Sequence, residues 1–333
     1  AYTKYIEMGV DGFRIDTVKH VSRNTFNRRF LPAFKEAGGE NFFMFGEVCT
    51  RVNEVWNKGV VPLSTPFYTW KERTNYSADD EAASHEAYAY EQGQGTNNQP
   101  TSDNHYLSGN NYHKPDYSKA SGMAVIDFPM HWNFSDANSA YGKRGDDKYY
   151  NDATWNVVYV DSHDYGPNMD NRYGGGTDAW AENMTFMWTF RGIPCLYYGS
   201  EIEFQAGAVA DKGPSAPLES TGRAYFGDNI EGSVTATDFG EYTNASGAVA
   251  TTLSKPLPKH LADLNKIRRA VPALQKGQYS NDGCNGNMAY KRRFTDSANG
   301  IDSFVLVTVS GGATFSGIPG GTYVDLVTGD KKT

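Results

Sequence analysis

Three acidic residues follow short runs that predict parallel β-strands. Asp16 ends an alternating segment, Glu47 follows the apolar run 42–46, and the pair His163-Asp164 follows another apolar run. The carboxyl ends of parallel strands meet at one rim of a β/α barrel, and active sites of barrel enzymes lie on that rim. The sequence therefore predicts that these side chains cooperate in acid–base or nucleophilic chemistry.

The surroundings of the first two carboxyl groups predict different roles. The two-residue period of a strand puts Arg14 on the same side as Asp16, and a neighbouring guanidinium keeps a carboxylate ionised, which suits a nucleophile. Glu47 ends one of the most apolar runs of the chain, and a carboxyl group in apolar surroundings can stay protonated as a general acid. Such a pair suits glycoside hydrolysis, and neighbouring strands about 4.8 Å apart favour the separation of roughly 5 to 5.5 Å found in retaining enzymes over the inverting arrangement.

Other interpretations remain open for these residues. A single Asp or Glu at a strand end is often a helix cap or an ion-pair partner. The segment 162–164, together with 16–20, could instead form the metal pair of a phosphohydrolase, although seven histidines without a His-x-x-x-His spacing are few ligands for a catalytic metal. A Ser-His-Asp hydrolase is disfavoured because the chain has no Gly-x-Ser-x-Gly motif.

The elements that position these residues follow a β-α-β order. Phe26, Phe30 and Phe34 recur every four residues and predict a helix over 22–37 that Gly38-Gly39 ends. A right-handed crossover then makes the flanking strands parallel and adjacent. Strands are predicted at 10–16, 42–45, 123–128, 157–161 and 193–198, and helices at 180–190 and, after two prolines, at 261–271.

Composition divides the rest of the chain. Residues 68–122 form a long polar excursion, and 205–255 are rich in Gly, Ser and Thr. From Met288 short alternating strands predict a small antiparallel β domain, which stops after the turn at 328–330 with no returning strand. We therefore predict a partial catalytic barrel over 1–280 with an insertion at 68–122, and a truncated all-β domain over 281–333. Candidates for a substrate-binding wall in the insertion are Tyr88, Tyr90, Tyr106, Tyr112 and Tyr117, for which packing within the loop is the alternative.

Charge and composition exclude several classes of partner. The net charge is −8 and the 31 Lys and Arg residues are scattered, which argues against nucleic acid. Aromatic residues make up 14% of the chain and suit stacking on sugar rings as well as ordinary packing. Three cysteines allow at most one disulfide, and no apolar run predicts a membrane span. The chain starts without Met and within a helical stretch, so we expect it to be part of a longer protein.

Four motifs together resemble the α-amylase family, glycoside hydrolase family 13. They are, in order, Gly12-Phe13-Arg14-Ile15-Asp16-Thr17-Val18-Lys19-His20, Phe45-Gly46-Glu47-Val48, Val160-Asp161-Ser162-His163-Asp164 and Gly192-Ile193-Pro194-Cys195-Leu196-Tyr197-Tyr198-Gly199-Ser200-Glu201. The resemblance implies strands four to eight of a (β/α)₈ TIM barrel, followed by a small antiparallel β-sandwich domain. The first family motif and strands one to three would precede Ala1, in a longer or second chain.

The same resemblance implies roles for individual residues. Asp16 would be the nucleophile, Glu47 the general acid/base, and Asp164 the carboxylate that binds sugar hydroxyls and stabilises the transition state. Implied substrate contacts are Arg14, Lys19, His20, His163, Glu219 and Arg223, although the family usually has Asp at the position of Glu219. The backbone carbonyl of His20 would be a ligand of a structural calcium ion.

The expected activity is therefore that of a retaining α-glycosidase acting on starch-type α-glucans or maltooligosaccharides. Alternatives are a glucanotransferase or cyclomaltodextrinase-type enzyme of the same family, and a non-catalytic carbohydrate-binding relative, which would usually have lost one of the three carboxylates. No membrane or nucleic-acid partner is expected. The resemblance implies an extracellular or periplasmic location.

Overall fold

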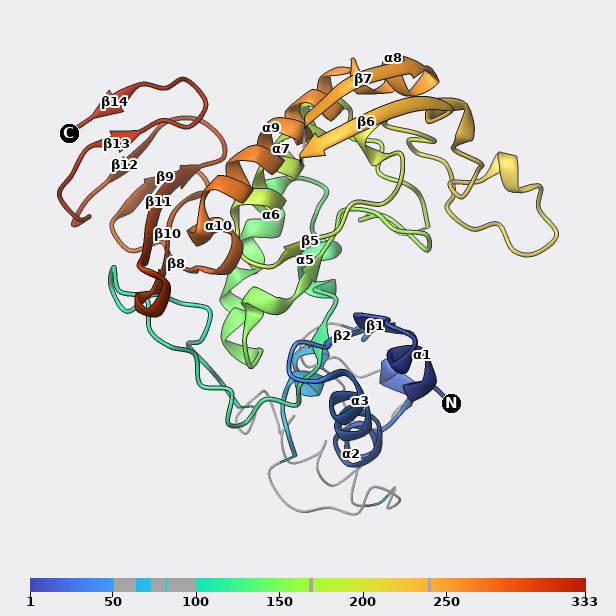
Figure 1. The fold of residues 1–333 in the computed structure, drawn as a ribbon, viewed down its shortest axis with the longest axis horizontal. Helices are drawn as coiled ribbons and strands as arrows, with labels where there is room; N and C mark the ends of the chain where they lie inside the picture. The colour runs from blue at the N-terminus through green and yellow to red at the C-terminus, as the bar shows by residue number, and fades with distance from the viewer. Residues whose placement is uncertain (51–63, 73–81, 83–99, 168–169, 239–240) are drawn as a thin grey trace. The chain divides into compact units, whose positions relative to one another are not determined.

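The computed structural model describes residues 1–50, 64–72, 82, 100–167, 170–238 and 241–333 (Figure 1). The chain divides into two compact units. The first unit comprises Ala1–His105, Lys114–Met130 and Lys143–Val158, and the second comprises Tyr106–His113, His131–Gly142 and Tyr159–Thr333.

A parallel sheet forms the centre of the first unit. Strands β1 (Gly12–Ile15), β2 (Phe43–Gly46) and β3 (Ala124–Val125) lie in that order. A parallel bridge from Ile126 to Val157 continues the sheet toward β4 (Val157–Val158). A β-carbon at Gly12 would lie 2.5 Å from the carbonyl oxygen of Phe43, so glycine permits the close approach of β1 and β2. The predicted adjacent, parallel arrangement of the first two strands is confirmed.

A continuous helical segment connects β1 to β2. It runs through α2 (Arg23–Thr25), a π-helical stretch η2 (Phe26–Phe30) and α3 (Leu31–Gly38), which Figure 1 draws beside α1 (Thr3–Glu7). Ser22 caps its start by accepting a hydrogen bond from the backbone N–H of Thr25, and Gly39 ends it with a left-handed φ of 77°. The helix predicted over 22–37 is confirmed, with a π-turn that its period did not indicate.

The apolar face of this helix packs on the sheet. Phe26 and Phe34 are buried and Phe30 is partly buried in a core that also contains Val18, Val48 and Val125. The apolar run 42–45 is not buried on both faces, because burial alternates along β2. Met44 is 3% exposed, whereas Phe43 and Phe45 are half-buried and stack on each other.

Antiparallel sheets and a helical layer make up the second unit. Strands β8 (Gln278–Ser280), β10 (Ala289–Asp296) and β11 (Ile301–Thr308) form one sheet, drawn in red-brown in Figure 1. Strand β9 (Cys284–Gly286) pairs with β12 (Ala313–Phe315), and β13 (Tyr323–Val324) pairs with β14 (Lys331–Lys332). The antiparallel β region predicted at the C-terminal end is present.

Aromatic side chains join α7 (Thr177–Thr189) to this sheet. Phe190, at the end of the helix, lies with its ring centroid 4.6 Å from that of Tyr279 and 5.0 Å from that of Tyr290. Helix α9 (Pro256–Ala270) packs along α7, and α10 (Pro272–Lys276) packs on β10 and β11. The helices predicted at 180–190 and 261–271 are therefore present.

The remaining elements are short. They are η1 (Val18–His20), η3 (Thr65–Thr69), α5 (Phe128–His131), α6 (Ala137–Tyr141), η4 (Gly142–Tyr149), η5 (Ala153–Trp155), β5 (Ile193–Pro194), η6 (Ser200–Ile202), η7 (Leu218–Ser220), η8 (Gly227–Asn229), β6 (Gly232–Asp238), β7 (Glu241–Gly247), α8 (Ala248–Leu253) and η9 (Ser297–Asn299).

Several predictions about these elements are wrong. The strands predicted at 123–128, 157–161 and 193–198 shrink to two residues each. The turn at 328–330 does have a returning strand, because β14 pairs back on β13. Strands β6 and β7 pair antiparallel within the region 205–255, for which composition indicated no strand.

Two expectations from the sequence concern disulfide bonds and membrane-spanning helices. None of the three cysteines is in a disulfide, and all three lie within the described residues. No helix in the part of the chain that the structure describes has the length and apolar character of a membrane span.

Candidate active site

The turn that follows β1 brings the backbone of residues 17 and 18 against Glu47. Thr17 adopts a left-handed conformation with φ of 50°, and its N–H donates to Oε2 of Glu47 at 3.0 Å. The N–H of Val18 donates to the carbonyl oxygen of Glu47, and the N–H of Glu47 donates to that of Ile15. The carboxyl group of Glu47 is thus held directly beside the end of the strand that precedes Asp16.

Arg14 bridges the two predicted catalytic carboxylates. Its Nη1 donates a short hydrogen bond to Oδ1 of Asp16, and its Nη2 lies 3.6 Å from Oε2 of Glu47. The prediction that Arg14 and Asp16 share one side of the strand is confirmed. Because one guanidinium contacts both carboxylates, their oxygens lie closer than the roughly 9.5 Å upper limit for paired glycosidase carboxyls.

The two carboxylates differ in exposure. The side chain of Asp16 is 64% exposed, whereas that of Glu47 is 14% exposed. An exposed carboxylate beside a guanidinium is ready to attack an electrophile, and a more buried one can exchange a proton with a group that reaches it. The sequence predicts that Arg14 lies beside Asp16 alone, whereas the structure places the same guanidinium near Glu47 as well, and the separate roles of the two carboxylates stay predictions.

Lys19 and His20 lie on the same turn. The ammonium group of Lys19 donates to the carbonyl oxygen of Cys49 at 2.9 Å, which ties the η1 turn to the segment after β2. His20 ends η1 and is exposed. Their substrate contacts stay predictions.

The third predicted carboxylate, Asp164, belongs to the second unit. Nη2 of Arg223 donates to its Oδ1 at 3.0 Å, and Nε of Arg223 donates to the carbonyl oxygen of His163 at 2.6 Å. The imidazole Nε2 of His163 lies 3.2 Å from Oδ2 of Asp164. The structure therefore brings Arg223 to the His163-Asp164 pair, which the sequence nominated separately from it.

Arg223 has a second acidic partner that the sequence did not indicate. Its Nη1 lies 3.0 Å from Oδ2 of Asp211, on the segment before η7. Glu219, nominated as the acid paired with Arg223, is exposed on η7, and its sugar contact stays a prediction. Asp211 has no strand pattern or motif around it, so only the folded loop reveals it.

A buried ion pair supports the segment that carries Asp164. Nε of Arg172 donates to Oδ2 of Asp161 at 3.2 Å, and the two side chains are only 1% and 2% exposed. The hydroxyl of Ser200 donates to the other carboxylate oxygen at 2.7 Å. Asp161 and Ser200 stand within quoted motifs, but no sequence pattern nominated Arg172.

The fourth motif lies against this pair. The guanidinium of Arg172 sits 4.5 Å from the ring centroid of Tyr197. Burial raises the pKa of the Glu201 carboxyl group, and the nearby charge of Arg172 opposes that shift. The motif at 192–201 thus helps to enclose the buried ion pair.

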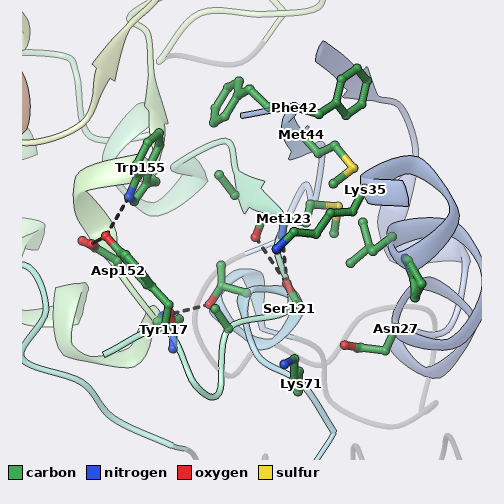
Figure 2. A pocket seen from close by; sticks show the side chains of 18 of the residues that line it. Asn27, Lys35, Phe42, Met44, Lys71, Tyr117, Ser121, Met123, Asp152 and Trp155 are labelled. Carbon is green, nitrogen blue, oxygen red and sulfur yellow. Dashed lines mark hydrogen bonds between the residues drawn. The ribbon is translucent and has the colours of Figure 1, made fainter. Parts of the chain in front are cut away.

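A separate groove in the first unit is not part of this chemistry. Its volume is about 970 Å³, and Figure 2 shows Trp155 and Tyr117 on one side of it and Phe42 and Met44 on the other. Phe42 and Met44 stand at the amino end of β2, whereas Glu47 follows its carboxyl end. The groove therefore lies at the opposite end of the strand from the carboxylates.

The tyrosines of the predicted wall have other contacts. The ring of Tyr106 packs on Tyr279 and that of Tyr112 on Phe294, so both pack against the C-terminal sheet. Tyr117 donates to Oδ2 of Asp152 at 2.8 Å in the groove (Figure 2). Tyr88 and Tyr90 lie outside the described residues.

No group of three or more His, Cys, Asp or Glu side chains suited to a metal ion occurs among the residues that the structure describes. His20 could contribute only a backbone oxygen, whereas calcium takes six to eight oxygen ligands. A calcium site that includes the backbone carbonyl of His20 stays a prediction.

The fold of the chain is similar to the folds of solved amylase-type enzymes. The chain superposes on the crystal structure of an Anoxybacillus α-amylase with a TM-score of 0.50, at 17% identity, covering 99% of this chain and 56% of that one. It superposes on a γ-cyclomaltodextrin glucanotransferase from alkalophilic Bacillus clarkii with a TM-score of 0.51, at 16% identity, covering 98% and 36%. These similarities establish a common fold.

The family model of the α-amylase catalytic domain matches residues 1–219 of this chain. The chain therefore belongs to the α-amylase family. Its fold is accordingly a TIM barrel with a C-terminal β domain. An α-amylase of Streptomyces lividans is 27% identical over 96% of this chain, which spans 31% of that relative. A cyclomaltodextrin glucanotransferase of Klebsiella oxytoca is 22% identical over 97% of the chain, which spans 43% of it.

Proposed function

We propose that this chain carries the catalytic residues of a retaining α-glycosidase that acts on starch-type α-glucans or maltooligosaccharides. The observation that carries the proposal is the guanidinium of Arg14 in contact with both Asp16 and Glu47 at the carboxyl ends of neighbouring parallel strands. Strands β1 to β5 would then be strands four to eight of the barrel, residues 1–280 the barrel part, and 281–333 the β domain.

The reaction would be a double displacement. The carboxylate of Asp16 attacks the anomeric carbon while Glu47 donates its proton to the departing glycosidic oxygen, which leaves a glycosyl ester on Asp16. Glu47, now a carboxylate, takes a proton from water as the water oxygen attacks the anomeric carbon and Asp16 is released. Asp164, held by Arg223, would bind sugar hydroxyls and stabilise the oxocarbenium-like transition state.

Transglycosylation is the second candidate, since one relative is named a cyclomaltodextrin glucanotransferase. In that case a sugar hydroxyl would replace water in the second step. The presence of all three predicted carboxylates argues against a non-catalytic binding protein. The extracellular or periplasmic location, and the contribution of the missing barrel strands by a longer or second chain, stay proposals.

The products of the reaction test this function. The full-length protein incubated with maltooligosaccharides should release shorter ones, and NMR taken within the first turnovers should show the α-anomer at each new reducing end. Longer products would indicate transfer to sugar. Absence of cleavage, or initial release of the β-anomer, would refute a retaining α-glycosidase.

Treatment with a chelator distinguishes a calcium ion that stabilises the fold from a metal ion that takes part in catalysis. We expect a chelator to lower the melting temperature of the full-length protein, because a bound ion stabilises only the folded state. Initial rates on maltooligosaccharides, assayed below the new melting temperature, should stay unchanged. Immediate loss of turnover in the folded protein, with activity on phosphorylated substrates before chelation, would support the metal-dependent phosphohydrolase instead.

A further inference from the structure

Arg172 has contacts with three separate segments of the second unit. Besides Asp161, its Nη1 donates to the carbonyl oxygen of Gly222 at 3.2 Å. Its Nη2 donates to the carbonyl oxygen of Tyr198 at 3.0 Å and to the hydroxyl of Ser200 at 3.0 Å. A side chain that is 1% exposed and makes four hydrogen bonds fixes the relative positions of all three segments.

Two of these segments lead directly to the carboxylate of Asp164. Asp161 precedes Asp164 by three residues, and its carboxylate also accepts a hydrogen bond from the backbone N–H of Tyr173. Gly222 immediately precedes Arg223, whose guanidinium binds Asp164. Arg172 thus contacts both the segment that bears the carboxylate of Asp164 and the segment that bears Arg223.

Close packing at Gly222 makes this support stiff. A β-carbon there would lie 2.6 Å from Cγ of Arg172 and 2.9 Å from Cα of Ala210, so the backbone before Arg223 runs directly over the arginine side chain. The hydroxyl of Tyr198 also donates to the carbonyl oxygen of Ala224, just after Arg223. The backbone on either side of Arg223 is therefore anchored.

We propose that Arg172 is a positioning residue for Asp164: it acts through Asp161 and Gly222, without touching the substrate, to hold Asp164 and Arg223 in the geometry that the transition state requires. The inference rests on the proposed function, in which Asp164 stabilises the transition state. A shift of about 1 Å in such a group costs about 10²-fold in rate, so a remote buried side chain can have a large kinetic effect.

The test is a double-mutant cycle in the full-length enzyme. We expect Arg172→Met to lower kcat on maltooligosaccharides by about 10²-fold with little change in KM, because the lost interaction belongs to the transition state. In an Asp164→Asn background, assayed with a substrate that bears an activated leaving group, the same change should have little further effect. Ser200→Ala loses one hydrogen bond to Asp161 and should lower kcat less than Arg172→Met does. It replaces Arg172→Met in the test if that variant fails to fold.

The controls distinguish two kinds of failure. Arg268 is a half-buried arginine of the same unit that donates to the carbonyl oxygens of Trp188 and Gly192, so Arg268→Met should lower stability without changing kcat. If Arg172→Met or Ser200→Ala lowers kcat equally with and without Asp164, or leaves kcat unchanged in the folded protein, the positioning role is refuted. If Asp164→Asn itself retains normal turnover, the proposed function fails first.

Discussion

Replacing Asp16 by Asn or Glu47 by Gln should each lower turnover on maltooligosaccharides by about 10³-fold or more, while the protein stays folded. Asn cannot form the glycosyl ester, and Gln cannot donate a proton to the leaving oxygen. The substitutions preserve shape and remove one charge at partly exposed sites. Turnover is measured on the full-length enzyme, and folding by circular dichroism.

The leaving group of the substrate separates the two roles. A glucosyl fluoride needs no protonation to depart, so the Glu47→Gln variant should still form the glycosyl ester and release fluoride in a burst. The Asp16→Asn variant should show no burst, because the nucleophile is absent. Equal bursts from both variants would contradict the assignment of roles.

Matched surface substitutions provide the control. Asp263→Asn and Glu241→Gln make the same chemical changes at exposed side chains, each 3.9 Å from the ammonium group of Lys266. Such exposed ion pairs contribute little to stability, so both variants should retain normal turnover. Near-normal turnover of the Asp16 or Glu47 variant as well would remove the catalytic assignment.

The location of these carboxylates could be predicted because it depends on local periodicity. The two-residue period placed Arg14 beside Asp16, and the Arg14–Asp16 hydrogen bond confirms that inference. The helix with Phe26, Phe30 and Phe34 on one face followed from a four-residue repeat, and Gly39 ends it as expected. In each case residues close in sequence determine the contact.

Contacts between distant loops could not be predicted in this way. Arg172 reaches Asp161, Ser200 and Gly222 over separations of 11 to 50 residues, and no periodic pattern marks it. The hairpin of β6 and β7 was missed for a different reason. Val234 and Ala236 alternate with polar residues in β6, but these apolar side chains are few and small, and the hairpin is mostly exposed, so the pattern of a half-buried strand is weak.

The largest stability effect should come from Arg292 on β10. Its side chain is 0% exposed, and Nη1 donates to the carbonyl oxygens of Thr189, Phe190 and Leu274, while Nη2 donates to that of Gly277. These oxygens stand at the carboxyl ends of α7 and α10, where helices leave carbonyls unpaired and where a cation is favoured. One guanidinium therefore satisfies two helix ends at the C-terminal sheet.

The charge on Arg292 is retained at neutral pH. Burial, with some repulsion from Arg268, lowers its pKa to about 9, which is still above 7. Removing the side chain relieves the cost of burying a cation but leaves four carbonyls without this donor, each at a cost of about 1 to 3 kcal/mol. We expect the second effect to be larger.

Arg292→Met should accordingly lower the free energy of unfolding by about 3 kcal/mol and the melting temperature by about 5 °C, measured by calorimetry. Arg292→Lys should lose less, since it keeps a cation but has a single donor group. The neighbouring Arg293 is the control: its side chain is 20% exposed and pairs at 2.7 Å with Asp302, which is 58% exposed, so its Met variant should lose under about 1 kcal/mol. A Met variant of Arg292 as stable as the parent would show that burying the cation costs as much as its four hydrogen bonds contribute, and that the sheet docks on the helices through aromatic packing alone.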